Sequence, residues 1–262
     1  HFLPAEVLGK QRDKGKLKAP VSTILTDYNI HSMWIQPGVD AYFVASDEMA
    51  HALQEKGVGK ASVEVTGIPI LPDFAKDYPP REDMRRALGL NAEMRTILVA
   101  AGGFGMMSAD KTVKLLAEQI PAAQFIAVAG KNEALKKRLD KVAQLCDGRL
   151  KPFGFVNNMH ELMAASDMVV SKSGGLTTSE CLAMGLPLVV FNPIPGQEER
   201  NAVYLLEHGA GLWARTAAQM VYKTETLFND PDRLAEMQKN ARRLARPDAA
   251  FVIADRLMEA SE

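Results

Sequence analysis

The stretch that decides the fold runs from residue 167 to residue 180 and reads Asp-Met-Val-Val-Ser-Lys-Ser-Gly-Gly-Leu-Thr-Thr-Ser-Glu. Its opening segment, Asp167–Ser171, is mostly apolar, as is typical of a strand buried on both faces of a parallel sheet. The pair Gly174-Gly175 then turns the chain, and a helical pattern follows over Thr177–Met184. A strand, a glycine turn and a helix in this order form the repeating unit of a doubly wound α/β fold.

The same alternation continues on both sides of this stretch. Further strands are expected at residues 21–25, 41–45, 63–66, 96–101, 124–129, 150–153, 187–191 and 212–214. Helical patterns occupy residues 47–56, 108–119, 132–145, 198–208, 232–245 and 248–260. Apolar strands separated by helices predict parallel sheets that are covered by helices.

A proline-rich segment, residues 69–80, interrupts any regular element and predicts an interdomain linker. Only three strands precede it, so residues 1–68 are expected to be the C-terminal portion of an incomplete Rossmann-like domain. Residues 81–230 carry enough strand–helix units for a complete one, and residues 231–262 are expected to be C-terminal helices. The sequence begins at His1 without an initiator methionine, and we expect further residues to precede it.

Composition excludes several classes of protein. Among 262 residues, 47% are apolar and 24% charged, which is ordinary for a globular protein. The formal net charge of −1 gives no case for nucleic acid binding, and no apolar run approaches the roughly 20 residues of a membrane helix. The two cysteines, Cys146 and Cys181, form neither a disulfide framework nor a zinc-ligand spacing. Two basic clusters, within residues 10–18 and 239–246, are expected to be a solvated loop and a solvated helix face, or else to attract phosphates or anionic lipid.

Three loops that follow strands have compositions suited to a ligand. The first, residues 101–105, reads Ala-Gly-Gly-Phe-Gly between a strand and a helix, where glycines let the backbone approach a phosphate. A tight structural turn remains the alternative, because Ser108 stands where a complete dinucleotide fingerprint has its last glycine. The second, at Gly174-Gly175, offers another helix N-terminus. There Glu180 either completes a capping box with Thr177 or accepts hydrogen bonds from ribose hydroxyls.

The third loop, residues 192–201, reads Asn-Pro-Ile-Pro-Gly-Gln-Glu-Glu-Arg-Asn. Its amide and carboxylate groups match the donor and acceptor pattern of sugar hydroxyls. An acidic first helical turn that complements the helix dipole is the alternative. All three loops are expected at one edge of the same sheet, and together they indicate a ligand site more strongly than each does alone.

Several spaced motifs resemble the monogalactosyldiacylglycerol synthase and processive diacylglycerol glucosyltransferase family, from about Asp27 to the C-terminus. They are Thr26-Asp27-Tyr28-Asn29-Ile30-His31-Ser32-Met33-Trp34, Val65-Thr66-Gly67-Ile68-Pro69, Gly154-Phe155-Val156, residues 171–180, Pro195-Gly196-Gln197-Glu198 with Asn201, and the segment 240–247. The resemblance implies an α/β GT-B fold, in which two Rossmann-like domains face a cleft and the C-terminal one binds a UDP-sugar. It also implies that the C-terminal helices, residues 231–262, cross back to the N-terminal domain.

The resemblance also implies roles for individual residues. The Phe155–Val156 backbone would contact uracil and Glu180 the ribose, while Gln197 and Glu198 would contact the hexose and Asn201 would support their loop. The diphosphate would lie against two glycine turns, formed by Gly102, Gly103, Phe104 and Gly105, and by Ser173, Gly174, Gly175, Leu176 and Thr177. No metal or other cofactor is expected, because the family leaves the UDP charge to helix N-termini.

The catalytic base is unknown at this point, because the glycine-rich loop with its histidine that the family carries nearer its N-terminus is not found here. Asp27 and His31 are weak candidates, and His31 is equally a structural imidazole. Trp34 is expected to pack in the core rather than to contact lipid.

The expected function is transfer of glucose or galactose from UDP-glucose or UDP-galactose to diacylglycerol, which makes a glycolipid, although this chain by itself could be inactive. The enzyme would be cytoplasmic and peripheral, at the anionic inner face of the cell membrane. The alternatives are a transferase with another lipid or small-molecule acceptor, and a non-catalytic UDP-sugar-binding regulator. A dehydrogenase is disfavoured, since no acidic residue ends the strand 124–129.

Overall fold

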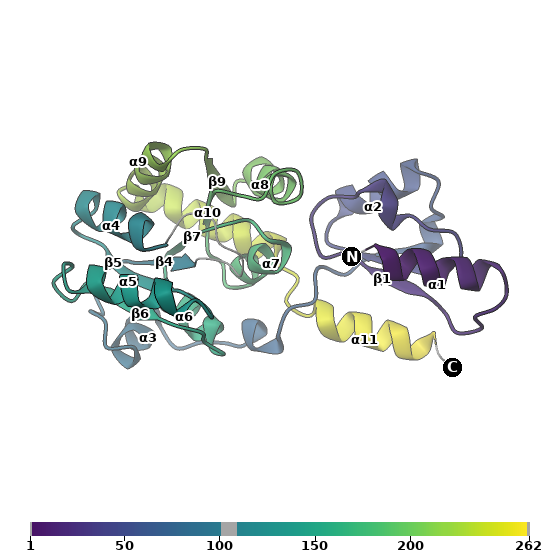
Figure 1. Cartoon of the computed structure of the whole chain (residues 1–262), viewed down its shortest axis with the longest axis horizontal. Coiled ribbons are helices and arrows are strands. Elements are labelled where there is room, and N and C mark those ends of the chain that lie inside the picture. Colours follow the sequence, from purple (N-terminus) through teal and green to yellow (C-terminus); the bar gives the residue numbers. More distant parts are fainter. Residues whose placement is uncertain (1, 101–108, 261–262) are drawn as a thin grey trace. The chain divides into compact units, whose positions relative to one another are not determined.

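The computed structural model describes residues 2–100 and 109–260. The chain divides into two compact units, and each is described by itself. Unit 1 consists of residues 1–75 and 246–262, and unit 2 consists of residues 76–245 (Figure 1). The first division falls inside the proline-rich segment 69–80, and the second separates the last two helices of the chain.

Unit 2 is built on a parallel sheet with the strand order β6-β5-β4-β7-β8-β9. Its strands are β4 (Thr96–Ala100), β5 (Gln124–Val128), β6 (Leu150–Phe153), β7 (Met168–Ser171), β8 (Leu188–Phe191) and β9 (Gly211–Ala214). All five residues of β5 are buried, because apolar side chains on both faces of the strand pack under helices. The strand order reverses between β4 and β7, and ligands of doubly wound sheets bind at the carboxyl ends of strands at such a point.

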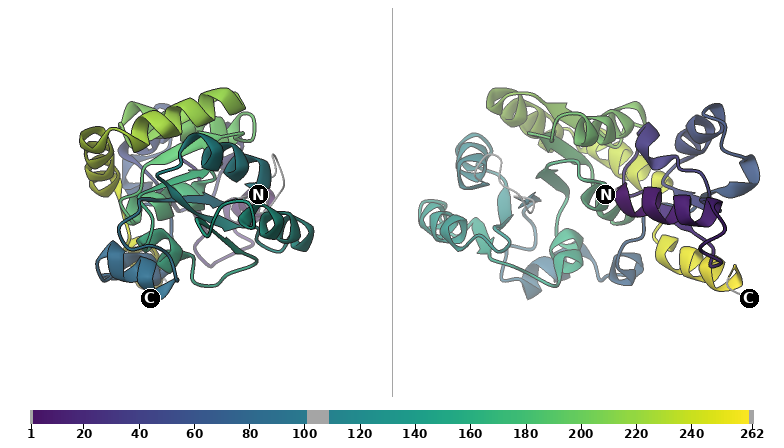
Figure 2. Two further views of the ribbon diagram at one scale, coloured as in Figure 1. Left: turned by 90° about the vertical axis from the view of Figure 1, so that its left-hand side faces the viewer. Right: turned by 45° about the vertical axis from the view of Figure 1, so that its right-hand side comes forward.

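Helices cover both faces of this sheet (Figures 1 and 2). They are α3 (Arg81–Ala87), α4 (Ala109–Gln119), α5 (Glu133–Ala143), α6 (Met159–Ala164), α7 (Gly175–Ala183), α8 (Gln197–Glu207), α9 (Ala217–Phe228) and α10 (Pro231–Leu244). Helix α4 packs against α5 and α9, and α7 packs against α8 and α10. The core between helices and sheet includes Leu116, Phe125, Leu139 and Leu227, none of which is exposed.

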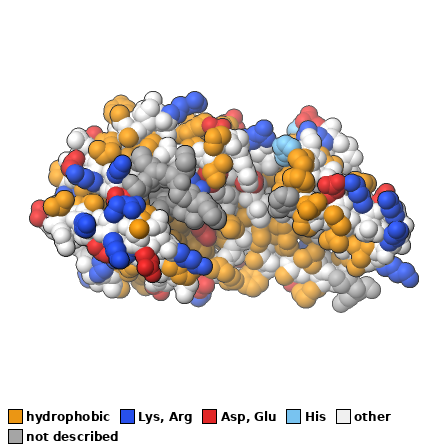
Figure 3. All heavy atoms as spheres, in the orientation of Figure 1, with side chains coloured by type: hydrophobic (Ala, Val, Ile, Leu, Met, Phe, Trp, Pro, Cys, Tyr) orange, Lys and Arg blue, Asp and Glu red, His pale blue; other side chains and the backbone are white. Residues whose placement is uncertain are grey.

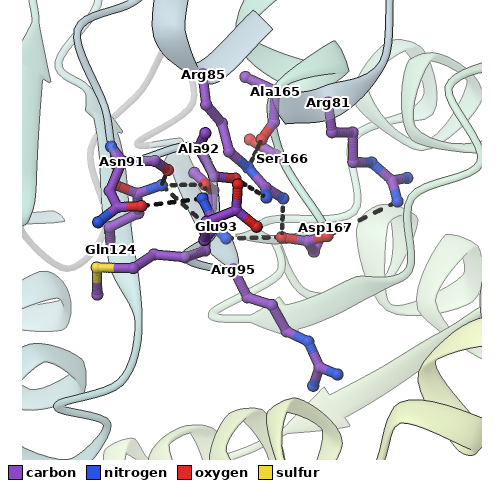
Figure 4. Close-up of polar contacts among 12 residues, drawn as sticks. Arg81, Arg85, Asn91, Ala92, Glu93, Arg95, Gln124, Ala165, Ser166 and Asp167 are labelled. Atoms are coloured by element: carbon purple, nitrogen blue, oxygen red, sulfur yellow. Dashed lines mark hydrogen bonds and ion pairs between the residues drawn. The ribbon is translucent and has the colours of Figure 1, made fainter. Parts of the chain in front are cut away.

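A polar network ties together the amino ends of β4, β5 and β7, at the edge of the sheet opposite to the expected ligand (Figure 4). Buried Gln124 donates from Nε2 to the carbonyls of Asn91 and Met94 and to the hydroxyl of Thr96. Asp167 accepts the Thr96 N–H at 2.7 Å. These contacts connect three strands without using their carboxyl ends.

Unit 1 contains a three-stranded parallel sheet in the order β1-β2-β3. The strands are β1 (Ser22–Ile24), β2 (Ala41–Val44) and β3 (Val63–Val65). The α-helices are α1 (Leu3–Asp13), α2 (Asp47–Glu55) and α11 (Ala249–Glu259). Short 3-10 helices are η1 (Ser32–Trp34), η2 (Lys60–Ser62) and η3 (Pro72–Ala75). Helix α11 returns to this unit, where Arg256 Nε lies 3.0 Å from Glu64 Oε1. The close approach requires Gly67, because a Cβ there would lie 2.5 Å from the Cβ of Arg246.

The structure confirms the α/β class and all nine expected strands, with ends that differ by at most one residue. The expectation that residues 10–18 form a loop is wrong for its first part. Helix α1 begins at Leu3, has Pro4 in its first turn and continues through Lys10 and Arg12. Arg12 is fixed by an ion pair, with Nε 3.1 Å from Asp40 Oδ2. The second cluster matches its expectation, since Lys239, Arg242 and Arg243 are exposed on α10.

Three further helices, α3, α6 and α9, were not expected from the sequence. Within residues 2–100 and 109–260, every helix is too short or too polar to span a bilayer.

Candidate functional site

The expected ligand segments follow β6, β7 and β8, whose carboxyl ends lie at one edge of the unit 2 sheet because all the strands are parallel. The loop after β4, with Gly102, Gly103, Phe104 and Gly105, lies outside the described residues. The rest of the site can be built from the three other strand ends.

Helix α7 begins immediately after the β7 turn, with Gly174 as its N-cap and Gly175 as its first residue. Gly174 has no side chain with which to cap this helix, so the N-cap residue offers no side-chain acceptor to the N–H groups of the first turn. Gly174 has φ −61° and ψ 145°, a conformation that other residues adopt readily, and a Cβ there would make only ordinary contact with Glu198 Oε1 at 3.7 Å. The backbone geometry therefore does not demand glycine, and the missing side chain leaves the helix end accessible to an anion.

The predicted residues at the start of α7 and just before it differ in their exposure. Ser173 is fully buried, Leu176 is exposed and Thr177 is partly exposed. Ser179, by contrast, bonds within the helix, to the carbonyl of Gly175.

The capping-box alternative for Glu180 is wrong. Because α7 starts at Gly175, Thr177 already lies inside the helix and cannot be its N-cap. The carboxylate of Glu180 forms no hydrogen bond or ion pair with any described residue. Burial raises the pKa of Glu180 to about 7, since the charged form loses solvation without gaining a partner. A half-buried carboxylate in this state is suited to accept hydrogen bonds from a ligand.

The loop between β8 and α8 is held in a conformation that proteins use sparingly. Asn192 has a φ of 50° and Gly196 a φ of 83°, so two residues of this five-residue loop lie in the left-handed region. Glu199 Oε2 accepts the N–H of Gly196 at 2.9 Å and so closes the first turn of α8. Gln197, the first residue of the helix, is exposed.

Glu198 does more than complement a helix dipole. Its side chain is almost fully buried, Oε1 lies 3.0 Å from Lys172 Nζ, and Oε2 accepts the N–H of Ile194 at 2.6 Å. Lys172 therefore reaches from the end of β7 to the start of α8. The sequence motif includes Lys172, but its role is not visible there, because its partner lies 26 positions along the chain.

Two more hydrogen bonds join the same two loops. Ser173 Oγ donates to the carbonyl of Glu198 at 2.6 Å, and Asn201 Nδ2 donates to the carbonyl of Ser173 at 2.9 Å. Asn201 has no exposed surface, so it supports the loop from beneath. Together with the ion pair, these bonds make the ends of β7 and β8 one connected polar structure.

The end of β6 presents Phe155 with 61% of its surface exposed, and Val156 is partly exposed. Lys131 Nζ lies 5.2 Å from the centre of the Phe155 ring, which places a cation over an aromatic face. The exposed aromatic ring offers a surface on which a base can stack.

The weak catalytic candidates lie in unit 1. His31 is exposed, and its Nδ1 accepts the N–H of Met33 at 3.2 Å, so it serves as the N-cap of a 3-10 turn. Asp27 is partly exposed in the loop after β1. Trp34 packs against the unit 1 core, as the sequence predicts.

A doubly wound parallel sheet with glycine-containing and polar loops at its carboxyl edge, accompanied by a second parallel α/β unit, is typical of the GT-B class of fold. MurG of Acinetobacter baumannii shares the fold over 98% of this chain and 69% of its own, with a TM-score of 0.67 at 17% identity. The UDP-GlcNAc 2-epimerase of Neisseria meningitidis shares it over 96% of this chain and 72% of its own, with a TM-score of 0.69 at 17% identity.

Sequence comparison then defines the family. Residues 96–253 match the glycosyltransferase family 28 C-terminal domain, and residues 1–70 match monogalactosyldiacylglycerol (MGDG) synthase. The processive diacylglycerol beta-glucosyltransferase of Bacillus pumilus is 31% identical over 99% of this chain and 67% of its own length. Its namesake in Bacillus thuringiensis is 34% identical over 93% of this chain and 62% of its own length. The chain belongs to the glycosyltransferase family 28 proteins that include the diacylglycerol glycosyltransferases, and it spans about two thirds of the length of these relatives.

Proposed function

We propose that this chain carries the donor-binding part of an enzyme that transfers a hexose from a UDP-sugar to diacylglycerol. Family membership supports the reaction class, and the names of the two relatives support the acceptor. The single observation that carries the assignment is Glu180, a half-buried carboxylate with no described partner, on the helix that follows the Gly174-Gly175 turn.

The proposed donor lies along the carboxyl edge of the unit 2 sheet. Uracil would meet the Phe155–Val156 backbone, and the ribose hydroxyls would donate to Glu180. The diphosphate would rest on the N–H groups at the start of α7, where the helix dipole favours negative charge. Gln197 and Glu198 would reach the hexose. The UDP-sugar would be a co-substrate, and the α7 N-terminus would offset the UDP charge in place of a metal.

The reaction would proceed by attack of an acceptor hydroxyl on the anomeric carbon. The bond from this carbon to the UDP oxygen breaks, the proton of the hydroxyl passes to a base, and UDP departs with its charge facing the α7 N-terminus. Whether the hexose is glucose or galactose depends on the orientation of a single hydroxyl, and either sugar fits this proposal.

We also propose that unit 1 meets an anionic membrane surface at the inner face of the cell membrane. Leu3, Val7 and Leu8 are exposed on α1, and Figure 3 shows hydrophobic side chains gathered over this helix with cationic ones at its C-terminal end. Lysines continue beyond it at positions 14, 16 and 18. Apolar side chains beside cations bind anionic bilayers through burial and charge together.

Vesicles test the membrane proposal. Replacing Lys10, Lys14, Lys16 and Lys18 by glutamine should weaken binding to phosphatidylglycerol vesicles and leave binding to phosphatidylcholine vesicles unchanged. Replacing the exposed lysine and arginines of α10 by glutamine is the control. Equal binding by both variants would contradict a role of these lysines.

Calorimetric titration tests the donor site. The chain should bind UDP, UDP-glucose or UDP-galactose saturably and should not bind NAD, and Glu180→Ala should weaken UDP binding by roughly tenfold or more, because charge-assisted hydrogen bonds to the ribose are lost. Glu118→Ala, at an exposed position on α4, is the control. A folded chain that binds no uridine nucleotide would overturn the proposal. Incorporation of labelled hexose into diacylglycerol, compared between UDP-glucose and UDP-galactose, tests the reaction itself.

A further inference from the structure

The carboxylate of Glu198 lies beside the position that we propose for the diphosphate. Glu198 Oε1 is 3.7 Å from the position that a Cβ would occupy on Gly174, the N-cap of α7. The positive end of the helix dipole tolerates this carboxylate. A bound diphosphate would bring further negative charge to the same helix end, and two anions this close in a partly buried site repel each other strongly.

Lys172 neutralises the charge of Glu198 and so reduces this repulsion. Its Nζ lies 3.0 Å from Glu198 Oε1. Only 13% of the Lys172 side chain and 10% of the Glu198 side chain are exposed. A buried pair of opposite charges is neutral as a unit, so a neighbouring anion meets little net field from it. The pair is adjacent in space to the helix end, where the N-cap residue Gly174 offers no side-chain acceptor to the N–H groups of the first turn.

The same carboxylate also fixes the loop that is proposed to receive the hexose. Glu198 Oε2 accepts the N–H of Ile194 at 2.6 Å, so a carboxylate that is held by Lys172 also holds the middle of the β8–α8 loop. Each carboxylate oxygen keeps a second lone pair, and Glu198 can therefore still accept a sugar hydroxyl while it is paired.

From this geometry we infer that Lys172 is a positioning residue of the donor site, which cancels the charge of Glu198 beside the diphosphate and fixes that carboxylate toward the hexose. The inference rests on the proposed function. A direct role of Lys172 as a phosphate ligand is the alternative. The two roles predict different UDP affinities when Lys172 and Glu198 are replaced singly and together.

The test is UDP binding by four forms of the chain, measured by calorimetry. Lys172→Met should weaken UDP binding by about tenfold or more, because the unpaired carboxylate then faces the diphosphate. Adding Glu198→Gln to Lys172→Met should restore the affinity to within about threefold of the original. Glu198→Gln alone should bind UDP equally or more tightly, since Lys172 then faces the diphosphate as a free cation. If Lys172 binds phosphate directly, the double variant stays as weak as Lys172→Met, and the inference is overturned.

Uridine binding distinguishes a loss of affinity caused by charge repulsion from one caused by damage to the fold. It carries no phosphate, so Lys172→Met should bind uridine as the unaltered chain does in ligand-observed NMR, and a loss equal to that for UDP would contradict the inference. Lys172→Arg keeps the charge and should retain UDP binding. The matched control is Lys136→Met on α5, where Lys136 Nζ lies 2.6 Å from Asp140 Oδ1 in a more exposed pair, and it should have no effect.

The Glu198→Gln variant keeps the inference testable if Lys172→Met fails to fold. The amide oxygen of the introduced glutamine could still accept the N–H of Ile194, and a tenfold loss of UDP affinity in this variant would overturn the inference. A chain that binds no UDP before any substitution would instead overturn the proposed function, and the inference with it. UDP binding that Lys172→Met leaves unchanged would overturn the inference alone.

Discussion

Arg85 Nη2 lies 2.7 Å from Asp167 Oδ2, and this buried ion pair joins α3 to the start of β7. Arg85 also donates to the carbonyls of Ala165 and Ala92, so its guanidinium is satisfied on several sides. Asp167 in turn accepts the N–H of Thr96, the first residue of β4. The pair therefore connects the two strands between which the strand order reverses, and it does so at their amino ends (Figure 4).

Replacing one partner of this pair should be costly. Asp167→Ala should lower the free energy of unfolding by about 3–5 kcal/mol, because it leaves a buried guanidinium and a buried backbone N–H without their acceptor. Urea denaturation followed by circular dichroism measures the loss. The control is Asp83→Ala, which removes an exposed partner of Arg86 and should cost less than about 1 kcal/mol. A loss of similar size in both variants would show that the buried pair is not a main support of unit 2.

At the opposite edge of the sheet, donor binding should depend on pH through Glu180. With its pKa raised by burial to about 7, the carboxyl is mostly protonated at pH 6 and mostly ionised at pH 8. Ribose hydroxyls donate to the ionised form, so the affinity for UDP-glucose should rise by about tenfold from pH 6 to pH 8. UDP-glucose is the suitable probe, because its diphosphate is esterified at both ends and does not titrate in this range.

Calorimetry at several pH values provides the measurement. Glu180→Gln should bind UDP-glucose more weakly than the unaltered chain at pH 8 and should show a flat profile. An equally steep profile in Glu180→Gln would assign the pH dependence to another group.

The sequence predicts the strands well because the signal for each strand lies within a few consecutive residues. Each strand of unit 2 is a short apolar run bounded by polar or glycine residues, and such a run has few alternatives to a buried parallel strand. The glycine turn at 174–175 and the polar loop at 192–201 were visible for the same reason. Helices α6 and α9 were missed because α6 has only six residues and the α9 sequence contains β-branched residues that weaken a helical pattern.

The site contacts could not be predicted, since they join residues that are distant in the sequence. Lys172 and Glu198 are separated by 26 positions and Arg85 and Asp167 by 82, so neither pair leaves a local signal. Glu180 illustrates the opposite error. Its spacing from Thr177 fits a capping box, but the helix begins two residues earlier, and this removes the cap.

Glu180 should also make the chain less stable at the pH where it binds donor. The pKa of this group is about 7 in the folded chain and 4.5 in a solvated reference, so the folded state holds the proton more tightly. The resulting stabilisation is complete below about pH 4.5 and is lost as the pH rises through 7. Glu180→Gln removes the buried charge, and it should raise the free energy of unfolding at pH 8 by about 1–3 kcal/mol.

The comparison at two pH values isolates this effect. Urea denaturation of Glu180→Gln and of the unaltered chain should give similar stabilities at pH 4.5 and different ones at pH 8. The exposed control Glu118→Gln should match the unaltered chain at both. A Glu180→Gln variant that is less stable at pH 8 would indicate that the carboxylate has a structural partner.

Gly174 should be required by the ligand and not by the fold. Alanine accepts the backbone conformation at this position, and its Cβ would lie 3.7 Å from Glu198 Oε1, an ordinary contact distance. Gly174→Ala should therefore change the free energy of unfolding by less than about 1 kcal/mol. The added methyl group would stand at the helix end where the diphosphate is proposed to lie, and UDP affinity should fall by about tenfold or more.

Gly59→Ala is a closely matched control, because Gly59 has φ −60° and ψ 138°, also precedes a helical turn, and has open space around a Cβ. It should leave both stability and UDP affinity unchanged. Equal UDP binding by the two alanine variants would remove the α7 N-terminus as the diphosphate site. A large loss of stability in Gly174→Ala would show instead that the fold, and not the ligand, excludes a side chain there.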